Sequence, residues 1–172
     1  MLVRLDQLAT HLSKGLRPIY TLYGAEPLLM QEAADAIRAA ARAAGHTERQ
    51  VHTVAGAHFN WSALLGASQA MSLFADRQLI EIRIPSGKPG KDGSEALQRY
   101  CQVLSDDVVT LVTLARLDRQ QQASAWFGAL DGAGITVRVD PIERRALPQW
   151  IAQRLAAQGQ RVQAGEMGER TL

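Results

Sequence analysis

Hydrophobic residues along the chain follow two spacings in alternation, and these spacings predict strands separated by helices. Short runs rich in β-branched and aromatic residues predict five strands, at residues 19–23, 50–54, 79–84, 108–114 and 135–139. Apolar residues three and four apart predict helices at residues 5–14, 26–44, 60–70, 94–104 and 120–130. Because parallel strands need crossover helices, this alternation predicts an α/β fold with a five-stranded parallel, doubly wound sheet.

The patterns also predict how deeply individual elements are buried. The strand at 108–114 is apolar on both faces, as is typical of a central strand in a parallel sheet. In the strand at 79–84, three isoleucines alternate with Glu81 and Arg83, so we expect one face to be at least partly solvated. Arg38 lies on the polar side of the long helix at 26–44 and is expected in solvent.

The pattern changes at Asp140-Pro141, where the alternation of strands and helices ends. Beyond this point, residues 147–157 form one predicted amphipathic helix, and the final residues are polar. A lone helix cannot bury its own apolar face. The sequence therefore predicts one domain over residues 1–140 and the start of a second, helical domain over residues 141–172, whose remainder is missing.

One connection, between the helix at 60–70 and the strand at 79–84, is unusually apolar. It contains the run QAMSLF, that is Gln69, Ala70, Met71, Ser72, Leu73 and Phe74. Connections normally run over the surface and are polar. The three large apolar side chains are therefore either buried in the core of the domain or exposed as a binding site for a partner. The pattern alone leaves both possibilities open.

Composition excludes several classes of function. The 172 residues include 19 Lys and Arg against 17 Asp and Glu, and a net charge of +2 gives no broad electrostatic footprint for nucleic acid. The single cysteine, Cys101, excludes an internal disulfide and a cysteine-based zinc site. No apolar run approaches the roughly 20 residues that span a bilayer, and the first residues lack a signal-peptide core. We therefore expect a cytoplasmic protein with no membrane partner.

The turn after the first strand is where a doubly wound sheet binds a ligand. A phosphate loop needs several glycines, a lysine and a Ser or Thr, whereas this turn reads Gly24-Ala25-Glu26-Pro27. Glu26 also brings negative charge to the place of a phosphate. The loop at 87–94 is a poor substitute, because it follows another strand and has Asp92 where Ser or Thr is needed. With no ligand spacing among the histidines, we expect no cofactor, no metal and no catalytic site.

Four segments carry a resemblance to a known family. They are IYTLYGAEPLLMQEAADAIR (19–38), NWSALLGASQAMSLFADRQLIEIRI (60–84), SAWFGAL (124–130) and LPQWIAQRL (147–155). With these segments in this order, the chain resembles the N-terminal part of the δ subunit of the bacterial DNA polymerase III clamp loader. The resemblance implies an AAA+-like domain that has lost its phosphate loop, followed by the beginning of a small helical lid domain.

The same resemblance implies a non-catalytic role in DNA replication. In this family the δ subunit binds the β sliding clamp and promotes opening of the ring, which is then loaded onto primed DNA. The resemblance implies that ATP is used by the partner motor subunits γ/τ, that δ′ completes the assembly, and that primer–template DNA is contacted through the assembled complex. This chain would thus be a subunit of the DNA polymerase III holoenzyme, itself a nucleotidyltransferase complex.

Clamp contact in the family uses the position of the apolar connection. Carried over to this sequence, Met71, Leu73 and Phe74 match the hydrophobic plug, and Gln69 with Ser72 completes the general clamp-binding pattern. The resemblance thus favours the possibility that these side chains are exposed as a binding site for a partner. It implies that Leu73 and Phe74 anchor the clamp while the preceding helix presses near the clamp interface.

Two functions of other classes remain as alternatives. The first is an atypical nucleotide hydrolase or nucleotide-binding α/β domain, which would bind ATP near Gly24. The second is a DNA-binding module that uses Arg144, Arg145 and Arg154 near the predicted domain junction. A solvated helix surface explains these three arginines equally well.

Overall fold

The computed structural model describes residues 1–55, 59–69, 77–140, 151 and 154 of the chain. The chain separates into two compact units, Met1–Val139 and Asp140–Leu172. All helices and strands with described bounds belong to the first unit. In the second unit, the predicted helix at 147–157 lies outside the described residues apart from Ile151 and Arg154.

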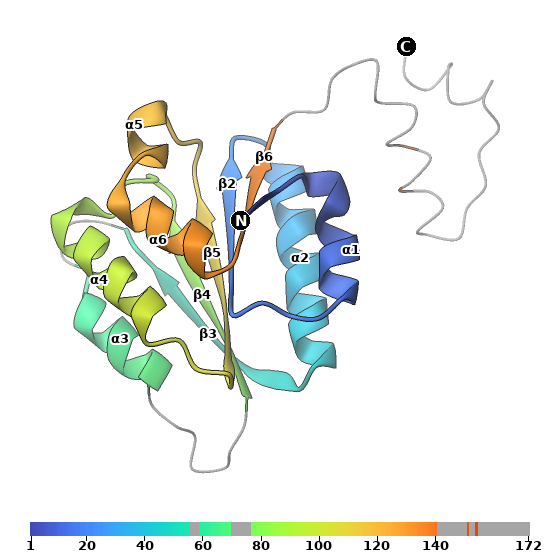
Figure 1. The fold of residues 1–172 in the computed structure, drawn as a ribbon, viewed down its shortest axis with the longest axis horizontal. Coiled ribbons are helices and arrows are strands. Elements are labelled where there is room, and N and C mark those ends of the chain that lie inside the picture. Colours follow the sequence, from blue (N-terminus) through green and yellow to red (C-terminus); the bar gives the residue numbers. More distant parts are fainter. Residues whose placement is uncertain (56–58, 70–76, 141–150, 152–153, 155–172) are drawn as a thin grey trace. The chain divides into compact units, whose positions relative to one another are not determined.

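The first unit is built on a six-stranded sheet in the order β1-β6-β2-β5-β4-β3 (Figure 1). The strands are β1 (Leu2–Val3), β2 (Ile19–Gly24), β3 (His46–Thr53), β4 (Arg77–Ile84), β5 (Val108–Leu114) and β6 (Ile135–Val139). Every neighbouring pair is parallel. The predicted parallel α/β sheet is confirmed, but it has six strands where the sequence pattern predicts five.

The additional strand, β1, lies at one edge of the sheet. Its two residues pair with Thr136 and Val137 of β6, and the N–H of Thr136 donates a hydrogen bond of 2.9 Å to the carbonyl of Met1. Two residues are too few to show the alternation by which strands are recognised. This strand is therefore specified by its pairing with β6 and not by a local pattern.

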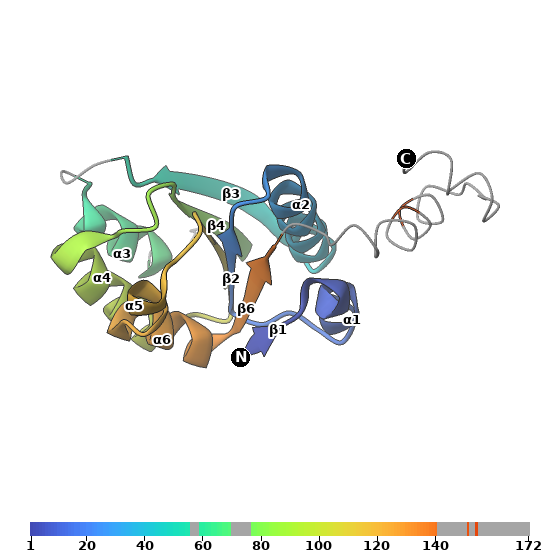
Figure 2. The same ribbon diagram turned by 90° about the horizontal axis from the view of Figure 1, so that it is seen from above.

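Helices cover both faces of the sheet, as Figures 1 and 2 show. One layer holds α1 (Leu8–Ser13), which a short 3₁₀ turn at Leu5–Gln7 precedes, and α2 (Pro27–Ala43). The other layer holds α3 (Trp61–Gln69), α4 (Gly90–Gln102), α5 (Arg119–Gln122) and α6 (Ala125–Ala133). This arrangement buries both faces of the central strands, and β5 is buried at every position except Thr113, which confirms the expectation for this strand.

Two of the predicted helices differ most from those observed. Helix α4 begins at Gly90, so its first turn occupies part of what we expected to be a loop. The helix predicted at 120–130 is instead two short helices, α5 and α6. They are separated because Ser124 adopts an extended conformation with ψ of 156° as the residue before α6, and a residue in that conformation ends a helix.

On the face of β4 that was expected to be partly solvated, Arg83 is 43% exposed, as expected, but Glu81 is buried. The residue is 1% exposed, and the Arg38 guanidinium of α2 donates to both of its oxygens, from Nε at 3.0 Å and from Nη2 at 2.8 Å. Arg49 of β3 donates to the same carboxylate. Arg38 was expected in solvent, but its side chain is only 18% exposed. Glu81 and Arg38 therefore form an internal ion pair that links β4 to α2.

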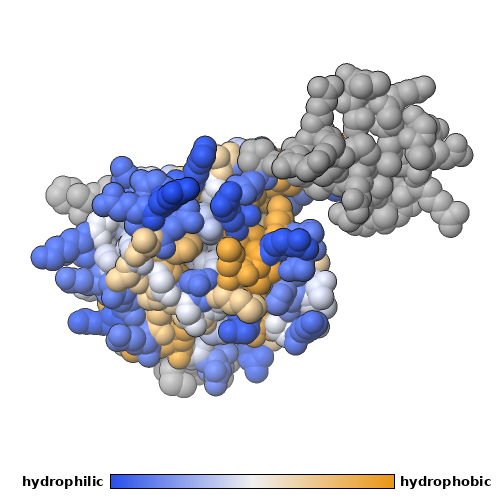
Figure 3. All heavy atoms as spheres, turned by 45° about the horizontal axis from the view of Figure 1, so that its top comes forward, coloured by the Kyte–Doolittle hydropathy of each residue, from blue (hydrophilic) through white to orange (hydrophobic). Residues whose placement is uncertain are grey.

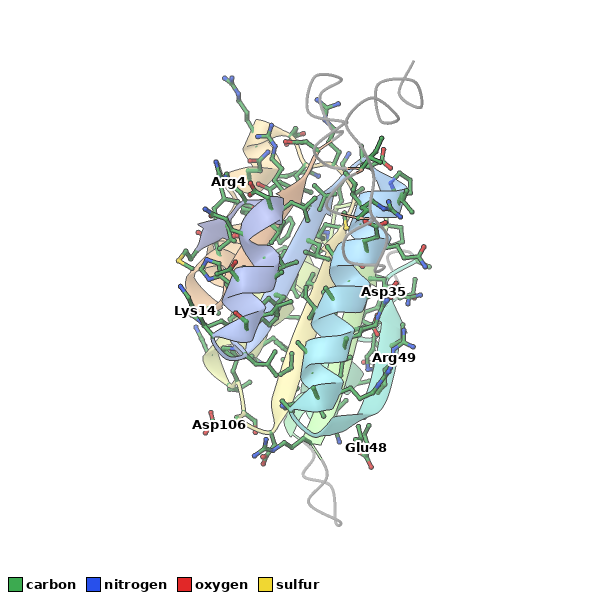
Figure 4. The ribbon with its side chains drawn as sticks, turned by 90° about the vertical axis from the view of Figure 1, so that its right-hand side faces the viewer. Arg4, Lys14, Asp35, Glu48, Arg49 and Asp106 are labelled. Atoms are coloured by element: carbon green, nitrogen blue, oxygen red, sulfur yellow. The ribbon has the colours of Figure 1, made fainter. Side chains whose placement is uncertain are left out.

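The arginines also determine the charge of this carboxylate. Burial alone would raise the pKa of Glu81, but the hydrogen bonds from Arg38 and Arg49 lower it, and the resulting pKa is about 2. Asp35 accepts a further bond of 2.6 Å from Arg38, and Figure 4 shows Asp35 and Arg49 on the same side of α2. Glu81 is thus charged throughout the physiological pH range.

Candidate functional site

All strands of the parallel sheet begin on one side, here called the amino edge, and end on the opposite side, here called the carboxyl edge. Each of these two sides has one candidate site. The connection from β2 to α2, which includes Glu26, leaves the carboxyl edge of the sheet. The connection formed by residues 70–76 joins the end of α3 to the start of β4 and is therefore attached at the amino edge. Glu48 and Asp106 also lie toward this amino edge in Figure 4.

Helix α3 leads into the connection, and its first residues pack against neighbouring parts of the fold. The side chain of Asn60 accepts a hydrogen bond of 3.1 Å from the N–H of Ala63 and so caps the helix. Leu64 is 1% exposed within the main core cluster. The Trp61 ring lies directly against Gly93 of α4, where an added Cβ atom would be 2.6 Å from Cζ2 of the indole. The first turn of α3 thus contacts α4 through Trp61, and Leu64 is buried in the core.

The start of β4, where the connection ends, is held by its neighbours. Arg77 Nη1 donates to the carbonyl of Ala44, just past α2, at 3.0 Å. The N–H of Gln78 donates to the carbonyl of Asp107 at 2.8 Å, and its own carbonyl is 3.0 Å from Nδ1 of His46. Three neighbouring segments therefore hold the first residues of β4 in place.

The predicted clamp-binding residues lie between these two ends. Gln69 is the last residue of α3. Met71, Ser72, Leu73 and Phe74 lie outside the described residues. Their role, like that of Gln69, stays a prediction, while the described structure gives the positions from which the connection starts and at which it ends.

At the carboxyl edge, Gly24 has a packing role. It has a φ of +154°, and a Cβ atom at this position would be 2.0 Å from the carbonyl oxygen of Val139 on β6. Only glycine allows this close approach of the two backbones. The one glycine that matches the first position of a phosphate loop is therefore required for strand packing.

The first turn of α2 likewise has a backbone N–H group that is already hydrogen-bonded within the protein and is not free for a phosphate. The carboxylate of Glu26 accepts a hydrogen bond of 3.2 Å from the N–H of Leu28, and Pro27 has no N–H to offer. A phosphate at this position would have to displace a carboxylate from a helix N-terminus that favours negative charge. Figure 3, which turns this edge forward, shows an apolar area bordered by hydrophilic residues, and Leu28 at this edge is 51% exposed.

The remaining candidate residues form no reactive centre in the described part of the chain. Burial raises the pKa of the Cys101 thiol to about 11, so it is protonated and packs beside the core, as predicted. Among residues 1–55, 59–69 and 77–140, no three His, Cys, Asp or Glu side chains are arranged to hold a metal ion. His58, Arg144 and Arg145 lie outside the described residues, and Arg154 is half-buried. No described helix is long and apolar enough to cross a bilayer.

Sequence reasoning missed a groove between α3 and α4. This α3–α4 groove has a volume of about 320 Å³ and is lined by Phe59, Asn60, Trp61, Ser62, Leu65, Asp92, Glu95, Ala96 and Arg99. The spacing of Asp92, Ala96 and Arg99 indicates a single helix face. That signal was hidden because the predicted helix began after Asp92, whereas α4 begins at Gly90.

Solved structures with the same fold define the class of this domain. The Bacillus subtilis DNA clamp loader delta protein superposes with a TM-score of 0.70 at 17% identity, over 94% of this chain and 50% of that protein. The Aeropyrum pernix ORC2 protein, in its ADPNP–ADP complexes, has a TM-score of 0.52 at 14% identity, over 88% of this chain and 51% of that one. The first unit shares its parallel α/β fold with these two proteins.

Sequence comparisons give the family. The sequence model of the DNA polymerase III delta subunit matches residues 20–140, so the chain belongs to the DNA polymerase III delta subunit family. It is 36% identical over 149 residues to DNA polymerase III subunit delta of Escherichia coli K12, which covers 87% of this chain and 43% of that protein. Identity to the Haemophilus influenzae subunit delta is 28% over 157 residues, or 90% of this chain and 45% of that one. The chain thus spans under half the length of these relatives.

Proposed function

We propose that this chain is the clamp-binding part of a clamp-loader δ subunit, and that it holds the β sliding clamp through residues 69–74. The observation that carries the proposal is the family match over residues 20–140, which includes the apolar connection. Two features of the fold support it. The connection is attached at the amino edge of the sheet, and the start of β4, where it ends, is held by three neighbouring segments.

The chemistry of the proposed contact follows from the residue types. Fully burying a leucine or phenylalanine side chain stabilises a complex by about 1.5–3 kcal/mol, and a few such anchors dominate most interfaces. Leu73 and Phe74 are the proposed anchors, and Met71 contributes apolar area beside them. Gln69 and Ser72 offer hydrogen bonds at the rim of the clamp pocket.

Opening of the clamp ring requires more than binding. A partner shifts an equilibrium only by binding one state more tightly than the other. In our proposal, Leu73 and Phe74 anchor the clamp while α3 presses near the interface that opens. This gives the open ring contacts that the closed ring lacks.

The other parts of the assembly complete the proposal. ATP is used by the partner subunits γ/τ and not by this chain, whose Glu26 already caps α2. The subunit δ′ is a further partner, and primer–template DNA is contacted through the assembled complex. Residues 141–172 are the start of the lid domain. Such a protein acts in the cytoplasm, as a non-catalytic subunit of the polymerase holoenzyme.

The test is binding of this chain to the purified β sliding clamp by surface plasmon resonance. We expect wild type to bind and Leu73→Ala/Phe74→Ala to bind at least about 100-fold more weakly, since two anchors are lost. The matched control is Leu28→Ala, which removes an exposed leucine at the opposite edge of the sheet, and it should bind like wild type.

Circular dichroism of the double variant separates loss of the contact from loss of the fold. A folded Leu73→Ala/Phe74→Ala variant with unchanged clamp affinity would contradict the proposal. Equal weakening by Leu28→Ala would also contradict it, because it would place the contact at the carboxyl edge.

A further inference from the structure

The α3–α4 groove has an aromatic wall that its neighbours hold in a fixed orientation. The rings of Phe59 and Trp61 meet edge to face with centroids 4.8 Å apart. Phe59 makes a similar contact with His52 of β3, at 6.5 Å, and Trp61 lies against Gly93. Both aromatic residues are only partly buried, so their rings remain available to line the groove.

The opposite wall of the groove is charged. Asp92, Glu95 and Arg99 come from one face of α4, which gives this wall one excess negative charge. Neither Asp92 nor Glu95 forms an ion pair with any described residue of the chain. Two carboxylates with no ion-pair partner among the described residues therefore line the groove together with two aromatic rings.

We propose that the α3–α4 groove receives an arginine side chain from a segment of a partner protein. A guanidinium stacks on aromatic faces and is attracted by their negative quadrupole. Its planar N–H groups also pair with carboxylates in a two-bond geometry. Asp92 or Glu95 on one wall and Trp61 on the other together supply both interactions.

Size and charge argue against other occupants. A volume of about 320 Å³ is at the lower end of the range for small-molecule pockets, so it suits one long side chain better than a cofactor. An acidic segment could pair with Arg99, but it would place like charges against Asp92 and Glu95, which is destabilising. The inference rests on the groove alone and not on clamp binding through residues 69–74.

The experiment is a titration of this ¹⁵N-labelled chain with a hexapeptide that alternates glycine and arginine, observed at the indole N–H of Trp61. The signal is assigned with Trp61→Phe. We expect a saturable shift of this signal, and an affinity about fivefold lower in Asp92→Asn/Glu95→Gln, since the exposed ion pair with the arginine is lost. Both substitutions keep the size of the side chains, so the groove itself is preserved.

The matched control is Asp106→Asn/Asp107→Asn, which removes the same charge from two exposed residues outside the groove. It should bind the arginine peptide like wild type. Equal affinity of the two double variants would overturn the proposal, because attraction would then depend on net charge alone. A shift of Trp61 with a glycine–glutamate peptide in place of the arginine peptide would also overturn it, as would no shift with either.

Discussion

The carboxyl and amino edges of this sheet differ in what they leave available for a partner. At the carboxyl edge, Gly24 packs against Val139 and Glu26 caps α2, so the groups that could cradle a phosphate already have internal roles. At the amino edge, the start of β4 is held by its neighbours, and residues 70–76, most of which are apolar, connect it to the end of α3. A sheet can therefore lose the ligand site typical of its fold and still offer a second edge for binding, because function depends on the site and not on the fold.

The largest expected effect tests whether Gly24 is structural. Gly24→Ala places a Cβ atom 2.0 Å from the carbonyl oxygen of Val139, and a backbone atom cannot move away without separating β2 from β6. We expect the free energy of unfolding to fall by at least about 3 kcal/mol in urea denaturation. The control is Gly132→Ala in α6, where a Cβ meets nothing within 4 Å. It should be neutral or stabilising by up to about 1 kcal/mol. If Gly24→Ala were as stable as wild type, Gly24 would not be required for strand packing, and a role in ligand binding would be open again.

A somewhat smaller effect concerns the ion pair that ties β4 to α2. Arg38→Met removes both hydrogen bonds from this arginine to a carboxylate that is 1% exposed. We expect a loss of about 2–3 kcal/mol at neutral pH, since breaking a buried pair leaves a charge poorly compensated. Arg42→Met on the exposed side of the same helix is the matched control and should change stability by less than about 0.5 kcal/mol.

The same ion pair gives a pH dependence. The pKa of Glu81 is about 2 in the folded protein against an ordinary value of 4.5, so the unfolded chain binds a proton at higher pH than the folded one. The stability from Glu81 is therefore complete above about pH 4.5 and is lost as the pH falls toward 2. Urea unfolding over this range should show a steeper decline for wild type than for Glu81→Gln. Parallel declines would mean that Glu81 is not held charged.

An intermediate effect tests how α3 is seated. Gly93→Ala places a Cβ atom 2.6 Å from the Trp61 ring and 2.7 Å from Pro89. Because the indole can move in part, we expect a loss of only about 1–2 kcal/mol, together with a change in the Trp61 indole signal. Gly128→Ala in α6, where a Cβ has open space, should show neither change. If Gly93→Ala changed neither the stability nor the Trp61 indole signal, Trp61 would not hold α3 on α4.

The smallest effect concerns nucleotide binding at the carboxyl edge. Glu26→Ala removes the side-chain cap of α2 and should cost about 0.5–1 kcal/mol. We expect that neither wild type nor this variant shows a saturable rise in Tm with magnesium and ATP. A saturable rise in wild type would contradict the account of this edge and would favour the alternative of a nucleotide-binding domain.

The sequence predicts those elements whose pattern is local. The strands predicted at 19–23, 108–114 and 135–139 lie within one residue of the observed ones, because each is an apolar run long enough to be recognised. β1 is missed because its two residues depend on pairing with β6. The division between α5 and α6 is missed because it depends on the conformation of one residue, Ser124.

Contacts between distant segments are what periodicity cannot predict. Alternation in β4 places Glu81 on a polar face, but it cannot reveal that Arg38 and Arg49, from two other elements, cover that residue. The α3–α4 groove is missed for the same reason, since its walls come from two helices that pack together only in the fold. The apolar connection was found because it violates a local rule, and its role as a binding site stays a prediction.

The most direct test of the central claim compares both edges in one measurement. Deuterium uptake of this chain is measured by mass spectrometry, alone and with the purified β sliding clamp. We predict that peptides covering residues 66–77 take up less deuterium in the presence of the clamp, while peptides covering residues 22–30 are unchanged. Protection of residues 22–30 with none at 66–77 would contradict the account and place the working site at the carboxyl edge.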